Sequence, residues 1–143
     1  RALVPRAVGL LAAGSAMKRP PVEPRTEGEI SDAVRLALGA EVDLVLWRNN
    51  TGVAEHATLD GDGKLRVDTV RYGLVRGGSD FVGVLAPRGR WFALEAKSAT
   101  GRATPEQLAF LALVRRMGGF ACIVRSVEDA RAALARARTG ASE

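Results

Sequence analysis

The sequence predicts an α/β domain in which a central mixed β-sheet is flanked by helices. Two short β-rich segments, residues 79–85 and 91–97, are joined by a hairpin-type turn at 86–90, which predicts an antiparallel pair. A helix and a third strand, at 120–124, follow directly. A strand–helix–strand step favours a parallel pair, so the expected sheet contains both kinds of pairing.

Length and composition fit a single domain. The chain has 143 residues, of which 47% are hydrophobic and 26% are charged, as in ordinary globular proteins. It contains one cysteine, Cys122, and one histidine, His56, which excludes an intrachain disulfide and a zinc cage of Cys and His ligands. The longest apolar run, at 7–16, is far shorter than the roughly 20 residues of a membrane span, and we expect a cytoplasmic protein.

The N-terminal 25 residues differ from the rest of the chain. Leu-Val-Pro-Arg at 3–6 resembles a thrombin-cleavage tag, and Gly-Ser-Ala-Met at 14–17 resembles a cloning scar. A secretory signal is the alternative, because a basic start precedes a short apolar run. We expect residues 1–25 to be a tag or flexible arm, residues 26–139 to form the domain, and residues 140–143 to be a flexible tail.

The first helix begins at a capping box formed by Thr26 and Glu29. Gly39 is expected to end this helix, since glycine is the commonest residue just past a helix C-terminus. Apolar residues at helical spacing predict a buried stripe along it, made by Ile30, Val34 and Leu38.

The next segments predict strands and turns. Residues 42–47 are β-rich and residues 48–52 form a polar loop. Asp-Gly-Asp-Gly at 60–63 is a strong turn signal, and a strand is expected at 65–70. Both tryptophans of the chain are expected in the core, Trp47 and Trp91.

Two further helices are expected in the C-terminal part. Thr104 caps the first, with Gln107 at its third position, in a second capping box. This helix is apolar almost all round up to about Met117, so we expect it to be well buried. Ser126 caps the last helix, at 127–138.

The most informative pattern is an aspartate, Asp80, followed fourteen residues later by Glu95-Ala96-Lys97. Side chains alternate along a strand, so Glu95 and Lys97 share one face while Ala96 points to the other. The hairpin can place Asp80, at the start of one strand, beside Glu95, near the end of its neighbour. Two carboxylates and a lysine would then meet at one end of the sheet.

Such a group of side chains is suited to cleaving a phosphodiester. Two close carboxylates repel each other, and a hard divalent cation such as Mg²⁺ removes that conflict. A nearby lysine balances charge, positions a water or stabilises developing negative charge. Taken singly, each residue has a plainer interpretation, with Asp80 capping a turn and Glu95 and Lys97 lying on a solvated strand face.

The Asp80 to Glu95-Ala96-Lys97 interval resembles the signature of the PD-(D/E)XK nucleases. Within that superfamily the chain is similar to the VRR-NUC nucleases, particularly the small stand-alone kind of phages and bacteria, over about residues 26–135. Ser79 replaces the proline of the superfamily's name, which changes a turn preference but no ligand. Further matching segments occur in order at 47–52, 77–80, 104–107, 118–120 and 124–129.

The resemblance implies a restriction-endonuclease-like fold and metal-dependent cleavage of DNA with Mg²⁺ or Mn²⁺. It implies that Asp80, Glu95 and the backbone carbonyl of Ala96 hold the ion together with an acidic residue of the first helix. Lys97 would orient the attacking water or stabilise the transition state.

The first helix offers two acidic residues, Glu27 and Glu29. Glu27 lies three residues before Ile30, on the apolar stripe, whereas Glu29 lies about 200° around the helix and serves the capping box. Helix geometry therefore favours Glu27. In the family a glutamine at the place of Gln107 reaches the active site, although the capping box explains this residue equally well.

Several polar residues are candidates for contacts with DNA. Arg48, Asn49 and Asn50 suit contacts with phosphates or bases, and Arg102 lies just past the catalytic strand. An ordinary polar loop and a solvated arginine are the alternatives. His56 is interpreted as a loop residue rather than a general base.

The net charge of +5 permits a nucleic-acid partner without demanding one. A bare core with no specificity domain favours structure-selective cleavage over recognition of a sequence. Stand-alone members of the family look like dimeric resolvases, so the resemblance implies a homodimer that cuts branched, Holliday-junction-like DNA. The alternatives are a non-catalytic DNA-binding module and a recruited nuclease subunit of a phage or repair complex.

Overall fold

The structure, a computed structural model, describes residues 26–143, and the expected tag or arm at 1–25 lies outside the described residues. The described part is a mixed α/β arrangement, which confirms the predicted class. Its elements follow in the order α1 (Glu27–Leu38), β1 (Leu44–Arg48), β2 (Gly52–Leu59), β3 (Leu65–Tyr72), β4 (Phe81–Leu85), β5 (Arg90–Ala96), α2 (Pro105–Arg116), β6 (Phe120–Val124) and α3 (Val127–Arg138).

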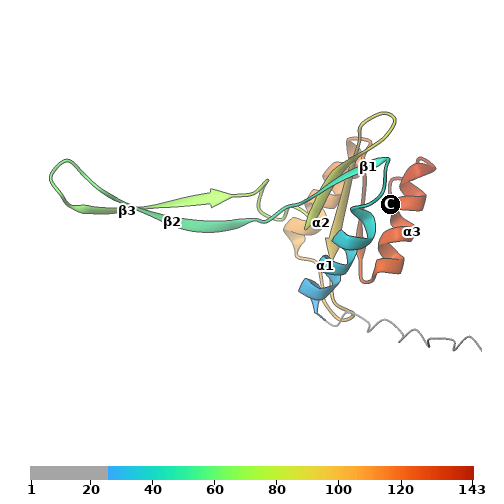
Figure 1. Ribbon diagram of the computed structural model, residues 1–143, viewed down its shortest axis with the longest axis horizontal. Helices are drawn as coiled ribbons and strands as arrows, with labels where there is room; N and C mark the ends of the chain where they lie inside the picture. Colours follow the sequence, from blue (N-terminus) through green and yellow to red (C-terminus); the bar gives the residue numbers. More distant parts are fainter. Residues whose placement is uncertain (1–25) are drawn as a thin grey trace, which may run out of the picture.

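Four strands form one mixed sheet in the order β1-β4-β5-β6 (Figure 1). β4 pairs antiparallel with both β1 and β5. β5 pairs parallel with β6, and α2 makes the crossover between these two strands, as the strand–helix–strand step predicts. In the β4–β5 register Phe81 faces Leu94, so the residue before β4 lies beside the C-terminal end of β5.

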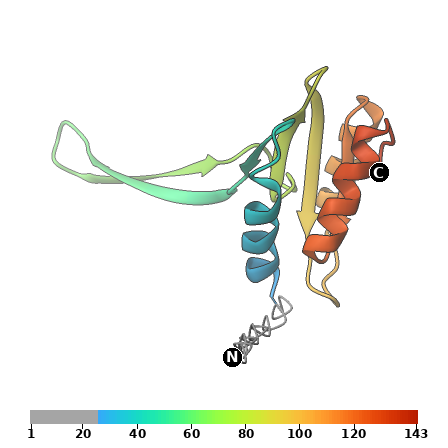
Figure 2. The ribbon, with the colours of Figure 1, turned by 45° about the vertical axis from the view of Figure 1, so that its right-hand side comes forward.

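Helices cover both faces of this sheet. α1 and α3 pack on one face, where Val34 and Leu134 join the larger apolar core with Phe92 and Phe120, whose rings stack with centroids 5.3 Å apart. Figure 2 shows α1 and α3 side by side. α2 packs on the opposite face. None of these three helices has the length and apolar character that crossing a membrane requires.

Each of these helices begins at a side-chain cap. Thr26 Oγ1 accepts a hydrogen bond from the Glu29 amide at 3.2 Å, and Glu29 Oε2 accepts one from the Thr26 amide at 2.8 Å. Thr104 and Gln107 form the same capping box on α2, and the Ser126 hydroxyl caps α3. These bonds satisfy amides that the helix itself leaves without partners, so they fix where each helix starts.

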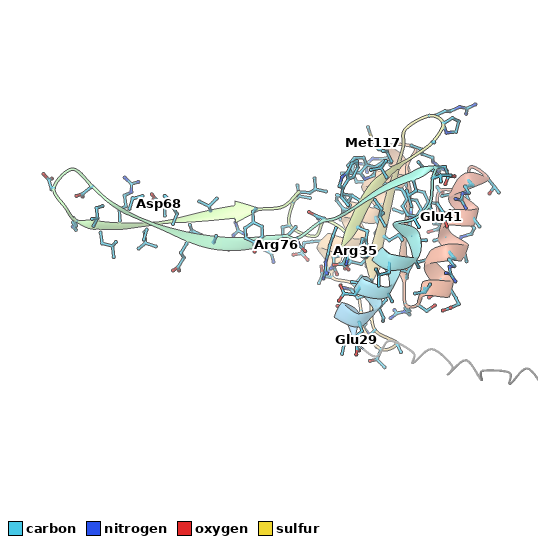
Figure 3. All side chains as sticks on the ribbon, in the orientation of Figure 1. Glu29, Arg35, Glu41, Asp68, Arg76 and Met117 are labelled. Carbon is cyan, nitrogen blue, oxygen red and sulfur yellow. The ribbon has the colours of Figure 1, made fainter. Side chains whose placement is uncertain are left out.

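β2 and β3 form a separate two-stranded hairpin, which we call the arm (residues 52–72). Figures 1 and 3 show it projecting from the body of the protein, with Asp68 far from the sheet. The sequence predicted the second strand, at 65–70, and the turn at 60–63, but not β2. Residues 52–59 mix small, charged and apolar side chains without strict alternation, so the usual strand signal is weak there.

Two expectations about burial are wrong. Trp47 and Trp91 are 50% and 38% exposed rather than in the core. α2 buries only Leu111 and Val114 fully, whereas Leu108, Leu113 and the C-cap residue Met117 are exposed, with Met117 77% exposed. In residues 26–143 α2 is the only helix on its side of the sheet, so no further layer covers its outer face.

Residues 140–143, expected to be a flexible tail, form contacts with the body. The Ala121 amide donates to the Ser142 carbonyl at 3.0 Å, so the tail bonds along the outer edge of β6. Glu143 forms an ion pair with Arg115 at 2.8 Å. The expectation rested on position in the sequence alone, which carries no information about backbone hydrogen bonding.

We expect Phe92→Ala to lower the free energy of unfolding by about 3–5 kcal/mol, because the ring is fully buried and stacked on Phe120. Urea denaturation followed by circular dichroism measures this loss. Leu36→Ala, at a largely exposed position of α1, is the control and should change stability by less than about 0.5 kcal/mol. Equal losses in the two variants would contradict the described core.

Candidate active site

Asp80 and Glu95 meet where β4 begins and β5 ends. The β4–β5 register places Asp80, the residue before β4, next to Glu95, as the hairpin predicts. Asp80 Oδ2 accepts a hydrogen bond from the Ala96 amide at 2.9 Å. This bond holds the aspartate side chain against β5 through Oδ2. The other carboxylate oxygen, Oδ1, takes no part in it.

Glu95 is a fully buried carboxylate on the α2 side of the sheet. Strand alternation puts it there, because its neighbours Leu94 and Ala96 point into the core on the other face. Glu95 Oε1 accepts hydrogen bonds from Lys97 Nζ at 2.7 Å and from Gln107 Nε2. Glu95 Oε2 is buried and has no hydrogen-bond partner among residues 26–143. A buried polar atom without a partner is rare and calls for an explanation.

Lys97 connects carboxylates from distant parts of the chain. It is 5% exposed, and its Nζ atom lies 2.7 Å from Glu95 Oε1 and 3.4 Å from Glu27 Oε2. Glu27 lies in the first turn of α1, whereas Glu29 bonds to Thr26 in the capping box. The structure therefore brings Glu27 to this group, as helix geometry favoured. We call the group the polar cluster: Glu27, Asp80, Glu95, Lys97 and Gln107.

Gln107 has both of the roles that the sequence left open. Its Oε1 atom accepts a hydrogen bond from the Thr104 amide at 2.9 Å, which completes the capping box of α2. Its Nε2 atom donates to Glu95 Oε1. One amide can do both because the third residue of α2 lies over the end of β5, so the start of the helix and the orientation of Glu95 are linked.

Asn49 serves the chain itself rather than presenting a free side chain. The Asn49 backbone amide donates to the Asp80 backbone carbonyl at 2.7 Å, and the side-chain Nδ2 donates to the Ser79 carbonyl at 3.1 Å. Its Oδ1 accepts a bond from the Leu74 amide at 3.2 Å. Asn49 was a candidate for contacts with DNA, but in the structure it holds the segment that leads into β4 and so positions Asp80.

The other candidate DNA contacts come from the end of β1 and from the loop after β5. Arg48 ends β1 and forms an ion pair with Asp32 at 3.0 Å. Asn50 and Arg102 are exposed, and Arg102 lies in the loop that follows Lys97. His56 belongs to β2 of the arm, where it pairs across from Asp68, outside the polar cluster.

Arg125 is a residue whose place the sequence analysis did not predict. Its guanidinium donates to the carbonyls of Ser98 and, at 3.0 Å, of Gly101. This holds the loop after Lys97 against Glu27. A Cβ atom on Gly101 would lie 2.6 Å from Glu27 Oε1, so glycine makes this close approach possible. The matching segment at 124–129 contained Arg125 but indicated no role for it.

The pKa values of Asp80, Glu95 and Lys97 are all raised above their usual values. Burial raises the pKa of Asp80 and of Glu95, and the nearby Lys97 offsets this only in part. Burial alone would lower the pKa of Lys97, but its bond to Glu95 and the charges of Glu95, Glu27 and Asp80 raise it overall. Carboxyl and amino groups with perturbed pKa values are typical of functional sites.

The donor atoms of the cluster fit a hard divalent cation. Carboxylates and carbonyl oxygens are the ligands that Mg²⁺ and Mn²⁺ prefer, and Glu95 Oε2 is buried with no partner of its own. Within residues 26–143, however, no three Asp, Glu, His or Cys side chains are arranged to hold an ion as they stand. The Lys97 ammonium contacts both Glu27 and Glu95, so it already neutralises part of their charge.

Comparison with known proteins identifies no relative, since no protein-family model and no curated protein sequence matches this chain.

We expect Glu95→Gln to leave the folded protein at least as stable as the wild type at neutral pH. The unfolded chain loses the Glu95 proton at the usual pKa and the folded chain only at higher pH, so wild-type stability falls as pH rises through that interval. Urea unfolding between about pH 4 and 7 should show the wild type losing stability relative to Glu95→Gln.

Glu55→Gln, on the exposed surface of the arm, is the matched control and should show no such divergence. If Glu95 mainly stabilised the fold through its bond to Lys97, Glu95→Gln would be clearly less stable than the wild type at neutral pH. That result would contradict the interpretation of Glu95 as a residue placed at a cost to stability.

Proposed function

We propose that this protein is a divalent-metal-dependent deoxyribonuclease of the VRR-NUC family, with a restriction-endonuclease-like core. One observation carries the proposal: a fully buried glutamate with an unpartnered oxygen meets a lysine and a second carboxylate at one end of a mixed sheet. These are the residues of the Asp80 to Glu95-Ala96-Lys97 interval. The chemistry of that group, rather than its contribution to stability, accounts for its burial.

The cost of burying the cluster supports a functional role. Replacing a buried ion pair by apolar residues is often neutral or stabilising, so a pair at this position is weak evidence for a role in stability. Perturbed carboxyl and amino groups that gather at the end of a strand are typical of active sites. A solvated strand face, the plainer interpretation of Glu95 and Lys97, does not fit their burial.

The ligands of the ion would be Glu27, Asp80, Glu95 and the backbone carbonyl of Ala96. When bound, Mg²⁺ or Mn²⁺ acts as a Lewis acid and lowers the pKa of a water molecule. Gln107 and Lys97 both bond to Glu95 Oε1, which fixes the carboxylate and keeps Oε2 free of other protein partners. The Ala96 amide fixes the Asp80 carboxylate through Oδ2, and the Asn49 backbone amide holds the Asp80 backbone carbonyl.

Lys97 has the central role among the chain's own groups. Hydrolysis forms a bond from a water oxygen to phosphorus and breaks the opposite phosphorus–oxygen bond, while negative charge builds on the phosphate oxygens. The buried ammonium of Lys97 orients the attacking water or stabilises that charge in a site where little water screens it. The leaving oxygen then takes up a proton, which completes hydrolysis to a phosphomonoester and an alcohol.

The substrate we propose is branched DNA of the Holliday-junction kind, cut by a homodimer whose two active sites serve two strands. The net charge of +5 and the exposed Arg102 and Asn50 suit contacts with the phosphate backbone. Such an enzyme would act in the cytoplasm of a bacterium or of a phage-infected cell.

We expect Lys97→Ala to reduce cleavage at least 100-fold, since it removes the buried positive charge that faces the phosphate. The assay uses labelled four-way-junction, flap, single-stranded and linear duplex DNA with Mg²⁺, Mn²⁺ or EDTA. Lys64→Ala, at an exposed lysine in the turn of the arm, is the matched control and should cut like the wild type.

Undiminished cutting by a folded Lys97→Ala variant would contradict the proposal. Tight binding of DNA by the wild type without cutting in either metal would favour the non-catalytic module or the recruited subunit. Co-purification from the host would separate these two, because only a recruited subunit is isolated with a larger complex.

Glu27→Gln should also reduce metal-dependent cleavage, by 10-fold or more, because it removes a negative charge that contacts Lys97. Glu29→Gln is the matched control two residues away. Glutamine can replace glutamate in a capping box, so that variant should keep both its helix and its activity. If Glu29→Gln lost cleavage and Glu27→Gln kept it, Glu29 rather than Glu27 would be the metal-binding carboxylate of α1.

A further inference from the structure

Within residues 26–143, no other element covers the arm. Its two strands pair only with each other, and nearly every residue of both is exposed. An isolated two-stranded hairpin is at best marginally stable in water, and persistence of such an element normally requires packing against a third layer. Figures 1 and 2 show the arm extending away from the body in both views.

The outer half of the arm has one apolar face and one polar face. On one side of the hairpin, the register pairs Ala57 with Val67 and Leu59 with Leu65. The pairs between them along the strands are polar, and their side chains point to the other side. Alternation of this kind is typical of a strand with one face buried. We call the apolar side the arm face: Ala57, Leu59, Leu65 and Val67. The opposite side carries His56, Thr58, Arg66 and Asp68.

The charge of the arm disfavours DNA as the molecule that covers it. Residues 52–72 contain four acidic and three basic side chains, a net charge of −1, although the whole chain carries +5. A hairpin that binds a polyanion would concentrate basic side chains. A nearly neutral, amphipathic hairpin fits an apolar protein surface instead.

Such a surface lies at the base of the arm. A pocket of about 400 Å³ opens there between the segment after β3, the start of β5 and the outer face of α2. Its lining includes Trp91, Leu113 and Met117, which the sequence placed in the core. We call it the base patch: Leu74, Val75, Trp91, Phe110, Leu113 and Met117.

We propose that the arm face of one protomer covers the base patch of a second copy of this chain, and the reverse. Figure 3 shows the arm, with Asp68, projecting away from Met117 of the same protomer's base patch. A two-fold exchange would therefore cover both apolar surfaces. Eight paired residues give the arm a reach of roughly 26 Å, enough to cross onto a neighbour. Together the large exposed side chains of both surfaces offer roughly 1,500 Å² over two copies, the size of a stable interface.

This inference rests on the homodimer of the proposed function and supplies its contact surfaces. Its test measures mass rather than nuclease activity, so it can fail while cleavage is retained. The wild type should sediment as a dimer at micromolar concentration. Leu59→Lys/Val67→Lys, on the arm face, and Met117→Lys, on the base patch, should each raise the dimer dissociation constant at least 100-fold. His56→Lys/Thr58→Lys adds two lysines to the polar face of the same arm, both on β2, and should remain a dimer.

Cross-linking tests which surfaces meet. A bismaleimide should join Leu65→Cys to Met117→Cys when the two variants are mixed, and should not join either variant to itself as efficiently. The one native cysteine, Cys122, is buried. A wild type that stays monomeric at about 100 µM would overturn the proposal and leave a different protein as the arm's partner. A dimer that survives the arm-face substitutions, or cross-links only arm to arm, would overturn it as well.

Discussion

The buried contact between Lys97 and Glu95 is the interaction on which the site depends. Removing water from two charges costs free energy that their attraction repays only with good geometry and further bonds. Here α1 supplies Glu27, the start of β4 supplies Asp80, and the start of α2 supplies Gln107, so three separate elements converge on the end of β5. The short capping boxes of α1 and α2 set where those helices start and hence where these side chains lie.

α2 connects the site with the surface through which we propose that two copies meet. Its first turn holds Glu95 through Gln107, its inner face packs on the sheet, and its outer face presents Leu113 and Met117. Ten residues of helix separate Gln107 from Met117, roughly 15 Å along the axis. A second copy bound to the outer face would therefore be separated from the polar cluster by no more than the length of α2.

Local signals in the sequence predicted the parts of the structure that depend on neighbouring residues. The capping boxes at Thr26 and Thr104, the β4–β5 hairpin and the meeting of Asp80 with Glu95 all follow from spacing, alternation and turn chemistry. The predictions that failed concern contacts between a segment and parts of the protein distant in sequence. The apolar content of α2 and Trp91 could not show that no further layer within residues 26–143 covers them. The hydrogen bonds of Asn49 and Arg125 join residues 24 or more positions away. The weak alternation of residues 52–59 likewise hid β2.

The central claim is that the polar cluster is a cation site, and Mn²⁺ binding tests it without knowledge of the substrate. Electron paramagnetic resonance of free Mn²⁺, titrated with the protein, counts the ions that the protein takes up. The account predicts that the wild type binds at least one ion that Glu95→Gln does not bind. Equal uptake by the two proteins, or no uptake by either up to about 10 mM Mn²⁺, would contradict the account.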